Sequence, residues 1–185
     1  MEIKGTAVKS IKDFVDNKFK ERSKEWFNSL PEATQEILKG DVFANNWYPM
    51  KDAAITPTKA IAKMFFNNDI KEAAFQSGRY SAEIGLKGVY KIFIMIAKPG
   101  YIIQRASRVF QSYYSPTDME VVETKIKGVT LHITKFPEPD HVIEYRIAGW
   151  IQKALELTNC NDVKVNITKS LTKGDQVTEF DITWN

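Results

Sequence analysis

The sequence contains few of the residues on which metal and cofactor sites commonly depend. Among its 185 residues there are one cysteine, Cys160, and two histidines, His132 and His141. A single cysteine excludes an internal disulfide and a cysteine-rich zinc site. His132 falls on an expected strand and His141 at the start of an expected helix, and we expect both to face solvent. We therefore predict no metal and no cofactor.

Motifs of enzymes are missing as well. The chain has no Gly-x-Ser-x-Gly nucleophile elbow and no glycine-rich phosphate loop. Its carboxylates are scattered among lysines, a pattern typical of a solvated surface. We expect no catalytic residues, and we expect that the protein is not an enzyme.

Long apolar runs and a strong charge imbalance are also absent. The longest apolar run, residues 92–97, is far shorter than the ~18–20 residues that span a bilayer. The first residues show no secretory signal pattern. The net charge of +3 is too small to indicate nucleic-acid binding. Residues 84–88, Ile-Gly-Leu-Lys-Gly, resemble the loop of KH domains, but they end a helical pattern and lack the preceding strand. We expect a cytoplasmic protein with no membrane span and no nucleic-acid partner.

The chain does contain enough apolar residues for one folded domain. Its composition is 43% hydrophobic and 26% charged, which is ordinary for a globular protein. No repeat or linker divides it, so we predict a single domain over residues 1–185. Apolar residues at helical spacing predict helices over the following ranges: 6–19, 23–30, 31–40, 56–65, 69–88 and 99–114.

The pattern changes to alternation after residue 118. Residues 119–126 and 129–136 read as strands joined by Lys127-Gly128, a two-residue hairpin signal. A helix capped by Asp140 follows, and then two more alternating segments at 163–167 and 180–184. The fold class predicted is α+β, with a helical N-terminal two-thirds packed on a C-terminal four-stranded antiparallel sheet made of two hairpins separated by a helix.

One predicted helix carries a row of small residues on a single face. Ala74, Gly78, Ser81, Gly85 and Gly88 follow each other at spacings of four, three, four and three. A glycine inside a helix costs roughly 1 kcal/mol relative to alanine. Either a neighbouring backbone packs against this face or a ligand lies on it, and the sequence leaves both readings open.

Several short motifs, in order, resemble a known superfamily. They are Leu30-Pro31, Trp47-Tyr48-Pro49, the glycines 78, 85 and 88, Gly149-Trp150, Gly174-Asp175 and Phe180-Asp-Ile-Thr-Trp184. The chain resembles the heme-nitric-oxide-binding (H-NOX), 4-vinyl reductase and TRAPP-subunit superfamily, and most of all an uncharacterised bacterial family within it. The resemblance implies a cleft between helices and a four-stranded sheet. That cleft holds heme in one branch and small or lipidic ligands, or a partner subunit, in others.

The sequence departs from the superfamily at two sites. H-NOX domains bind heme through a histidine on the helix before the sheet, and the helix expected at 99–114 has none. Their Tyr-x-Ser-x-Arg motif is also missing, because Tyr113-Tyr-Ser115 is followed by Pro116. Where the 4-vinyl reductase type carries cysteines, this chain has Ser170 and Thr178. The resemblance therefore implies neither heme nor a metal here.

These observations favour a binding role. We expect a non-catalytic ligand-binding or sensory domain with an apolar pocket for a small hydrophobic molecule, without heme. The expected ligand-binding residues are Gly78, Ser81, Gly85, Ile92, Ile96, Tyr101 and Arg105. Arg105 and Arg108 are open to a second interpretation as a solvated basic edge.

The alternative is a protein-interaction or dimerisation module of the TRAPP-subunit type. The N-terminal helices carry more large apolar side chains than a thin helical layer can easily bury, among them Phe14, Phe19, Trp26 and Phe27. Because exposed apolar patches mark interfaces, we expect a homodimer.

Overall fold

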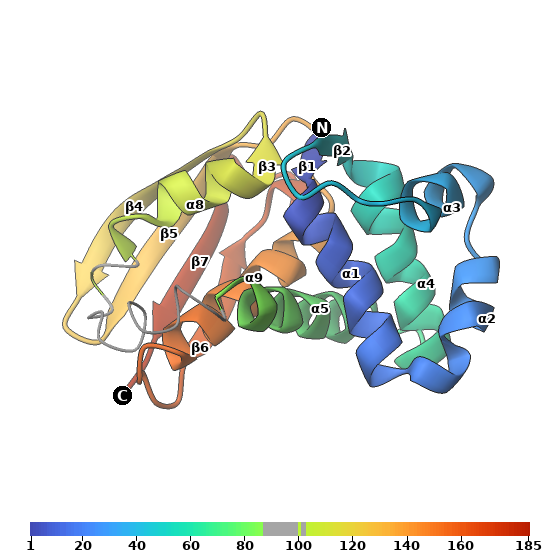
Figure 1. Ribbon diagram of the computed structural model, residues 1–185. Helices are drawn as coiled ribbons and strands as arrows, with labels where there is room; N and C mark the ends of the chain where they lie inside the picture. Colours follow the sequence, from blue (N-terminus) through green and yellow to red (C-terminus); the bar gives the residue numbers. More distant parts are fainter. Residues whose placement is uncertain (87–99, 101–102) are drawn as a thin grey trace.

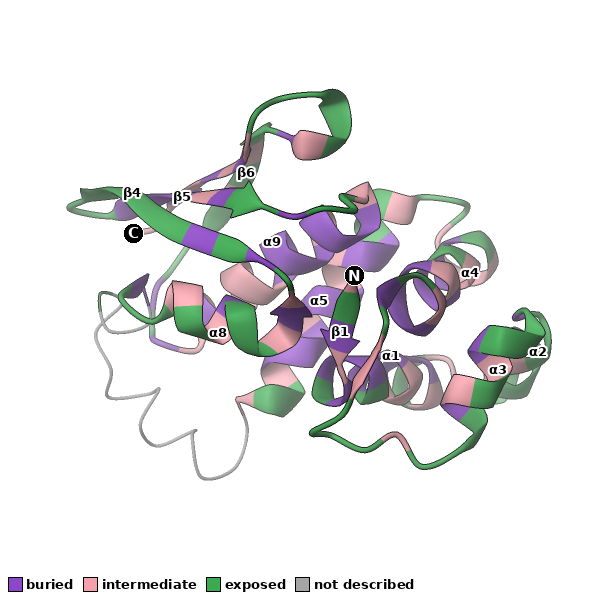
Figure 2. Ribbon diagram, turned by 90° about the horizontal axis from the view of Figure 1, so that it is seen from above, coloured by how far each residue is buried: buried purple, intermediate pink, exposed green. Residues whose placement is uncertain are grey.

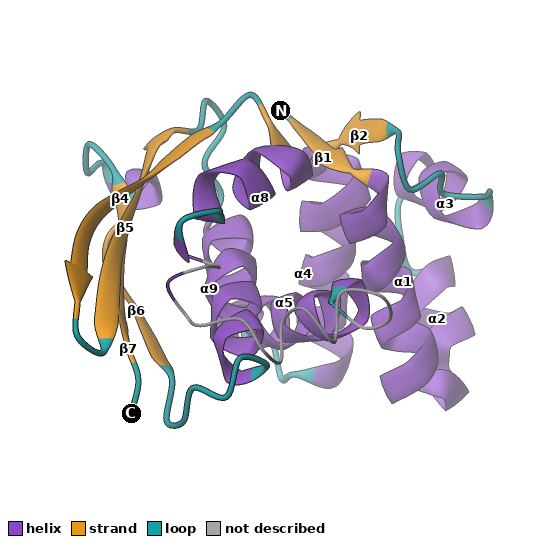
Figure 3. Ribbon diagram, turned by 60° about the vertical axis from the view of Figure 1, so that its left-hand side comes forward, coloured by secondary structure: helices purple, strands orange, loops and turns teal. Residues whose placement is uncertain are grey.

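Three layers make up the structure, a computed structural model that describes residues 1–86, 100 and 103–185. A four-stranded sheet forms one side, and helices α8 (Ala106–Tyr113) and α9 (His141–Glu156) lie against it (Figures 1 and 3). The N-terminal helices form the side of the molecule away from the sheet. No helix in these ranges is long and apolar enough to cross a membrane.

The N-terminal half is helical, as the spacing of apolar residues predicts. Its helices are α1 (Gly5–Lys18), α2 (Ser23–Asn28), α3 (Glu32–Lys39), α4 (Thr56–Phe65) and α5 (Ile70–Gly85). A short 3₁₀ turn at Lys20–Arg22 joins α1 to α2, and a π-helical segment at Lys51–Ile55 leads into α4. The Asp69 side chain accepts a hydrogen bond of 3.0 Å from the Glu72 N–H and caps α5.

A small sheet at the N-terminus was not expected. Strand β1 (Glu2–Lys4) lies between β2 (Trp47–Pro49) and β3 (Tyr114–Ser115), and both pairings are antiparallel. The Trp-Tyr-Pro motif forms β2. Strands of two or three residues are too short to show the alternation by which a strand is recognised.

The larger sheet contains the four strands that the sequence predicts. Its strands are β4 (Asp118–Lys125), β5 (Gly128–Lys135), β6 (Lys164–Lys169) and β7 (Thr178–Thr183), in the order β4-β5-β7-β6 with every pairing antiparallel. Helix α9, capped by Asp140 at 2.8 Å from the Val142 N–H, separates the two hairpins. The α+β fold class is confirmed.

Helices α5 and α9 pack on each other at the centre of the molecule (Figure 2), and seven of the 16 residues of α5 and nine of the 16 residues of α9 are buried. A Cβ atom built on Gly78 would lie 1.9 Å from the Arg146 carbonyl oxygen, and one on Gly149 would lie 2.0 Å from the Phe75 carbonyl oxygen. Each helix therefore has a glycine where the backbone of the other approaches. At Gly78, close packing explains the small residue.

The aromatic residues of the N-terminal helices do not form the exposed patch that we expected. Phe14 and Trp26 are buried, with 4% and 1% of their surface exposed. The ring of Phe19 stacks on that of Phe65, with 4.2 Å between centroids. The premise of the dimer prediction was wrong for these residues, because Phe14 and Trp26 are buried in the core and Phe19 packs on Phe65. The homodimer stays a prediction without that support.

Candidate functional site

A cavity of about 70 Å³ lies between α8, α9 and the four-stranded sheet. Most of its lining is apolar. The described residues that line it are Ala7, Ser81, Ile103, Ala106, Val109, Phe110, Tyr113, Tyr114, Met119, Val129, Leu131, Arg146, Ile147, Trp150, Ile151, Ala154, Leu155 and Ile182.

Alternation along the strands and helical spacing along α8 build this lining. On β5, Val129 and Leu131 point to the same face of the sheet, and Ile182 lies opposite Val129 on β7. Ala106, Val109, Phe110 and Tyr113 recur at three- and four-residue spacing, so one face of α8 covers the cavity.

Arg146 is the one charged residue among those lining residues. It is 2% exposed, and its guanidinium donates hydrogen bonds to the Ser77 hydroxyl, to the Ala7 carbonyl oxygen at 3.1 Å and to the Ser10 hydroxyl at 2.9 Å. All three acceptors are neutral. No ion pair joins Arg146 to a carboxylate within the described ranges, and residues 87–99 and 101–102 contain no Asp or Glu. The cavity thus borders a buried positive charge that has no counter-ion there.

Trp150 contributes a second polar group. It lies one helical turn after Arg146, so both side chains share a face of α9. Its indole nitrogen is buried and has no hydrogen-bond acceptor in the described part of the chain. The Tyr113 ring lies 5.9 Å away between centroids, and the indole is near enough to lower the pKa of that phenol, but without satisfactory hydrogen-bond geometry.

The two tyrosines at the cavity and Arg146 influence one another. Burial raises the pKa of both Tyr113 and Tyr114, and the positive charge of Arg146 opposes this rise. Burial likewise lowers the pKa of the Arg146 guanidinium, which the tyrosines partly offset. Arginine nevertheless stays protonated in proteins, so the cavity keeps a cation beside neutral phenols.

Among the predicted binding residues that the structure describes, one lines the cavity. Ser81 lines it. Gly85 is not among the lining residues, although a Cβ there would lie 3.2 Å from the hydroxyl of Tyr113, which does line the cavity. Gly78 instead faces the α9 backbone, and Arg105 is exposed at the start of α8 and is not part of the lining. Ile92, Ile96 and Tyr101 fall outside the described residues.

Arg146 and Trp150 were not among the predicted binding residues. Their signal was present in the sequence as Arg146-Ile-Ala-Gly-Trp150, an arginine within the apolar stripe of an otherwise amphipathic helix. An arginine at a buried helical position is rare unless it is paired, and that rarity would have identified it.

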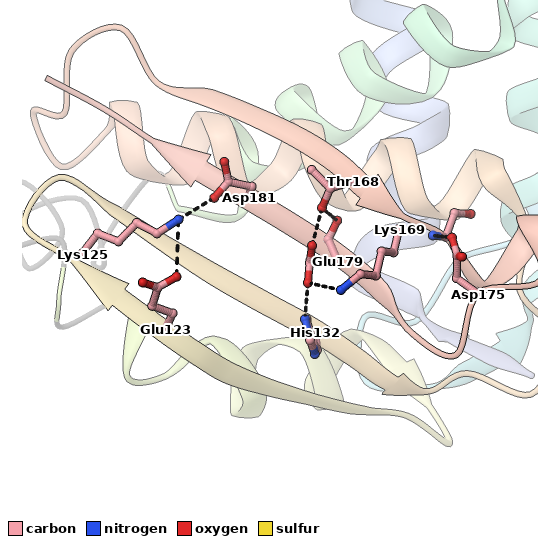
Figure 4. A network of polar contacts seen from close by, with 9 residues as sticks. Glu123, Lys125, His132, Thr168, Lys169, Asp175, Glu179 and Asp181 are labelled. Carbon is pink, nitrogen blue, oxygen red and sulfur yellow. Dashed lines mark hydrogen bonds and ion pairs between the residues drawn. The ribbon is translucent and has the colours of Figure 1, made fainter.

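Neither histidine lies at the cavity. His132 is on the outer face of the sheet, where its Nε2 lies 2.6 Å from a carboxylate oxygen of Glu179 (Figure 4). His141 is at the start of α9 with 44% of its side chain exposed. The described residues contain no group of three or more His, Cys, Asp or Glu side chains that could hold a metal ion.

Ser170 and Thr178, which stand where the 4-vinyl reductase type carries cysteines, meet at a buried carboxylate. The hydroxyl of Ser170 donates to Glu144 at 2.7 Å, the Thr172 hydroxyl donates at 3.2 Å, and the Thr178 hydroxyl donates at 2.5 Å. Three hydroxyl donors satisfy this carboxylate and tie the start of α9 to the turn between β6 and β7.

Solved structures with this architecture identify the fold. The H-NOX protein from S. oneidensis in the Fe(II)NO ligation state matches with a TM-score of 0.74 and 10% identity, over 99% of both chains. The Fe(II) unliganded H-NOX protein from K. algicida matches with a TM-score of 0.66 and 14% identity, over 99% of this chain and 97% of that one. The chain has an H-NOX-like fold. At these identities the likeness concerns the H-NOX fold alone.

The NMR structure of an H-NOX domain from Shewanella oneidensis in the Fe(II)CO state gives the same result. Its TM-score is 0.71 at 10% identity, over 99% of both chains. No protein-family model matches the sequence, and no curated protein matches it. The H-NOX-like fold that the sequence resemblance implies is thus confirmed.

Proposed function

We propose that this H-NOX-like domain is a non-catalytic sensory or carrier domain that binds a small apolar molecule, without heme, in the cavity between α8, α9 and the sheet. One observation carries the proposal: an apolar cavity of about 70 Å³ borders the buried hydrogen-bond donors of Arg146 and Trp150. Ligand sites are mostly apolar hollows with a few polar groups that orient the ligand.

The histidine positions support a heme-free site. The chain has two histidines. His132 lies on the outer face of the sheet beside Glu179, and His141 is exposed at the start of α9. Neither can ligate an iron in the cavity. A cavity of about 70 Å³ is also small beside the ~300–1,000 Å³ of pockets that hold larger ligands. The described residues therefore do not fit a histidine-ligated heme.

The alternative function is a protein-interaction module of the TRAPP-subunit type. A filled core with a flat apolar patch would favour it. The cavity beside α9, and the burial of Phe14 and Trp26, favour ligand binding instead.

The test is titration of the purified protein with butan-1-ol, a neutral apolar probe, followed by ¹⁵N–¹H NMR of the tryptophan indole signals. The sequence has four tryptophans, so the spectrum is simple to follow. We expect saturable movement of the Trp150 signal, because Trp150 lines the cavity.

A matched pair of variants checks the location. Ala106→Leu should fill the cavity and abolish binding, whereas Ala60→Leu, a half-buried alanine on α4 away from the cavity, should not. If the wild-type protein binds no butan-1-ol, the ligand-binding proposal is wrong and the interaction module becomes the better interpretation.

A further inference from the structure

We infer that the natural ligand of this cavity is a small monocarboxylate, whose carboxylate is bound by Arg146 and the Trp150 indole N–H and whose short hydrocarbon body packs among the apolar residues of α8, α9 and the sheet. This inference rests on the proposed function and names the chemical class of its ligand.

The first argument is charge. Arg146 is buried, donates to neutral oxygens of Ala7, Ser10 and Ser77, and is not paired with a carboxylate in the described ranges. A buried charge without its partner is the costly state of a buried ion pair. In the free protein the desolvation of this cation has already taken place on folding. A bound carboxylate would supply the missing negative charge, so no further desolvation of the cation opposes binding, and the remaining costs are the ligand's own desolvation and its lost freedom of motion.

The second argument is the unsatisfied indole. The Trp150 Nε1–H is buried without an acceptor, which is uncommon in folded proteins. Indole and guanidinium groups are donors only, and neither can accept a hydrogen bond. No carboxylate or amide side chain occurs among the described lining residues. Donors from two adjacent turns of α9 therefore border the same cavity, and the ligand group that complements them is an acceptor with negative charge.

The third argument is size. One water needs about 10–15 Å³ of such cavity volume, so about 70 Å³ accommodates a molecule equivalent to about five waters. That space suits a carboxylate with a chain of a few carbons. Apart from the hydroxyls of Ser81, Tyr113 and Tyr114, the remaining wall is hydrocarbon and favours an alkyl body over a second charged group.

A purely structural role for Arg146 is the competing explanation. Its three hydrogen bonds connect α9 to Ala7 and Ser10 on α1 and to Ser77 on α5, so it could serve only to hold these helices together. That role does not explain why the Trp150 N–H, on the same face, is left without an acceptor. The two explanations differ in whether an anion binds.

The experiment compares butyrate with butyramide, which has nearly the same shape but no charge. Each is titrated into the full chain at constant ionic strength, followed by calorimetry and by the indole NMR signals. We expect butyrate to bind at least about tenfold more tightly, since hydrogen bonds to charged groups are stronger than neutral ones. The Trp150 indole proton should move downfield with butyrate, because it gains an acceptor.

Variants separate the polar contacts from general packing. Trp150→Phe removes the N–H and should reduce butyrate affinity about tenfold while changing butyramide affinity much less. Trp184→Phe is the matched control, because Trp184 packs on the core but is not among the lining residues. Arg146→Met should abolish the preference for butyrate. If that variant does not fold, Trp150→Phe still decides.

The outcomes are distinguishable. Equal affinity for butyrate and butyramide, with no effect of Trp150→Phe on their ratio, would show that Arg146 only holds helices together and would overturn this inference. Binding of butan-1-ol would in that case leave the proposed function standing. Absence of binding by all three probes would reject both.

Discussion

At the scale of single residues, the outer face of the sheet carries a polar network around Glu179. Its carboxylate accepts from the Thr168 hydroxyl at 2.7 Å and lies 2.9 Å from the Lys169 ammonium and 2.6 Å from His132 Nε2 (Figure 4). Lys169 and the two hydrogen-bonding side chains lower the pKa of Glu179 to about 2. The network links β5, β6 and β7 on the face away from the cavity.

Glu179→Gln should therefore destabilise the protein in a pH-dependent way. The folded-state pKa is about 2, below the ordinary value of 4.5, so the carboxylate contributes stability above pH 4.5. That contribution is lost as the pH falls from 4.5 towards 2. We expect a loss of about 1 kcal/mol at pH 7, since solvent screens a surface network.

Urea unfolding of both proteins between pH 7 and pH 3 measures this difference. The gap between wild type and Glu179→Gln should narrow below pH 4.5. Glu123→Gln, at a more exposed carboxylate 3.5 Å from Lys125, is the control and should change stability little. A gap that stays constant with pH would contradict the pKa assignment.

At the scale of elements, the crossing of α5 and α9 holds the helical body against the layer that covers the sheet. Gly78 and Gly149 allow the two backbones to approach each other. The backbone of Arg146 lies at this contact, and its side chain extends from α9 to α1. The same helix that packs through Gly149 thus presents Arg146 and Trp150 to the cavity. Changes in the crossing should also displace those two donors.

Gly78→Ala should be strongly destabilising. The added Cβ would lie 1.9 Å from the Arg146 carbonyl oxygen, and a backbone atom cannot move aside as the end of a side chain can. Overpacking of this kind costs about 1–3 kcal/mol, and we expect the upper part of that range.

Thermal and urea unfolding measure the effect, with Gly40→Ala as the control. Nothing lies within 4 Å of a Cβ at Gly40, at the end of α3, so its substitution should change stability by less than about 0.5 kcal/mol. Equal stability of Gly78→Ala and wild type would show that α5 and α9 do not approach as closely as described.

At the scale of the whole molecule, an H-NOX-like fold is present, and neither histidine is among the described residues that line the cavity. The cavity faces hydrocarbon from the sheet and α8, and both histidines are elsewhere. The fold thus places a cavity for the proposed ligand but does not fix which ligand it takes, because the chemistry depends on the side chains at the cavity.

The protein should accordingly not bind hemin stoichiometrically. After incubation with one equivalent of hemin and gel filtration, we expect no Soret band in the protein fraction. A stoichiometric band that disappears in His132→Ala or His141→Ala would contradict this expectation, and the two variants would identify the ligand.

The sequence by itself determined the local structure. The positions of α1, α5 and α9 follow from apolar residues at helical spacing, and Asp140 caps α9 as predicted. The two hairpins of the sheet follow from alternation and from the Lys127-Gly128 turn. These features depend on neighbours within a few residues, so a sequence pattern records them directly.

Only the tertiary structure decided what lies against what. The small sheet joins residues 2–4 to 47–49 and 114–115, and the role of Gly78 depends on the backbone of Arg146, 68 positions later in the chain. The cavity likewise forms where α1, α5, α8, α9 and the sheet meet. Contacts between residues so far apart leave no periodic signal in the chain, because each side chain's partner is set by how the helices and strands pack.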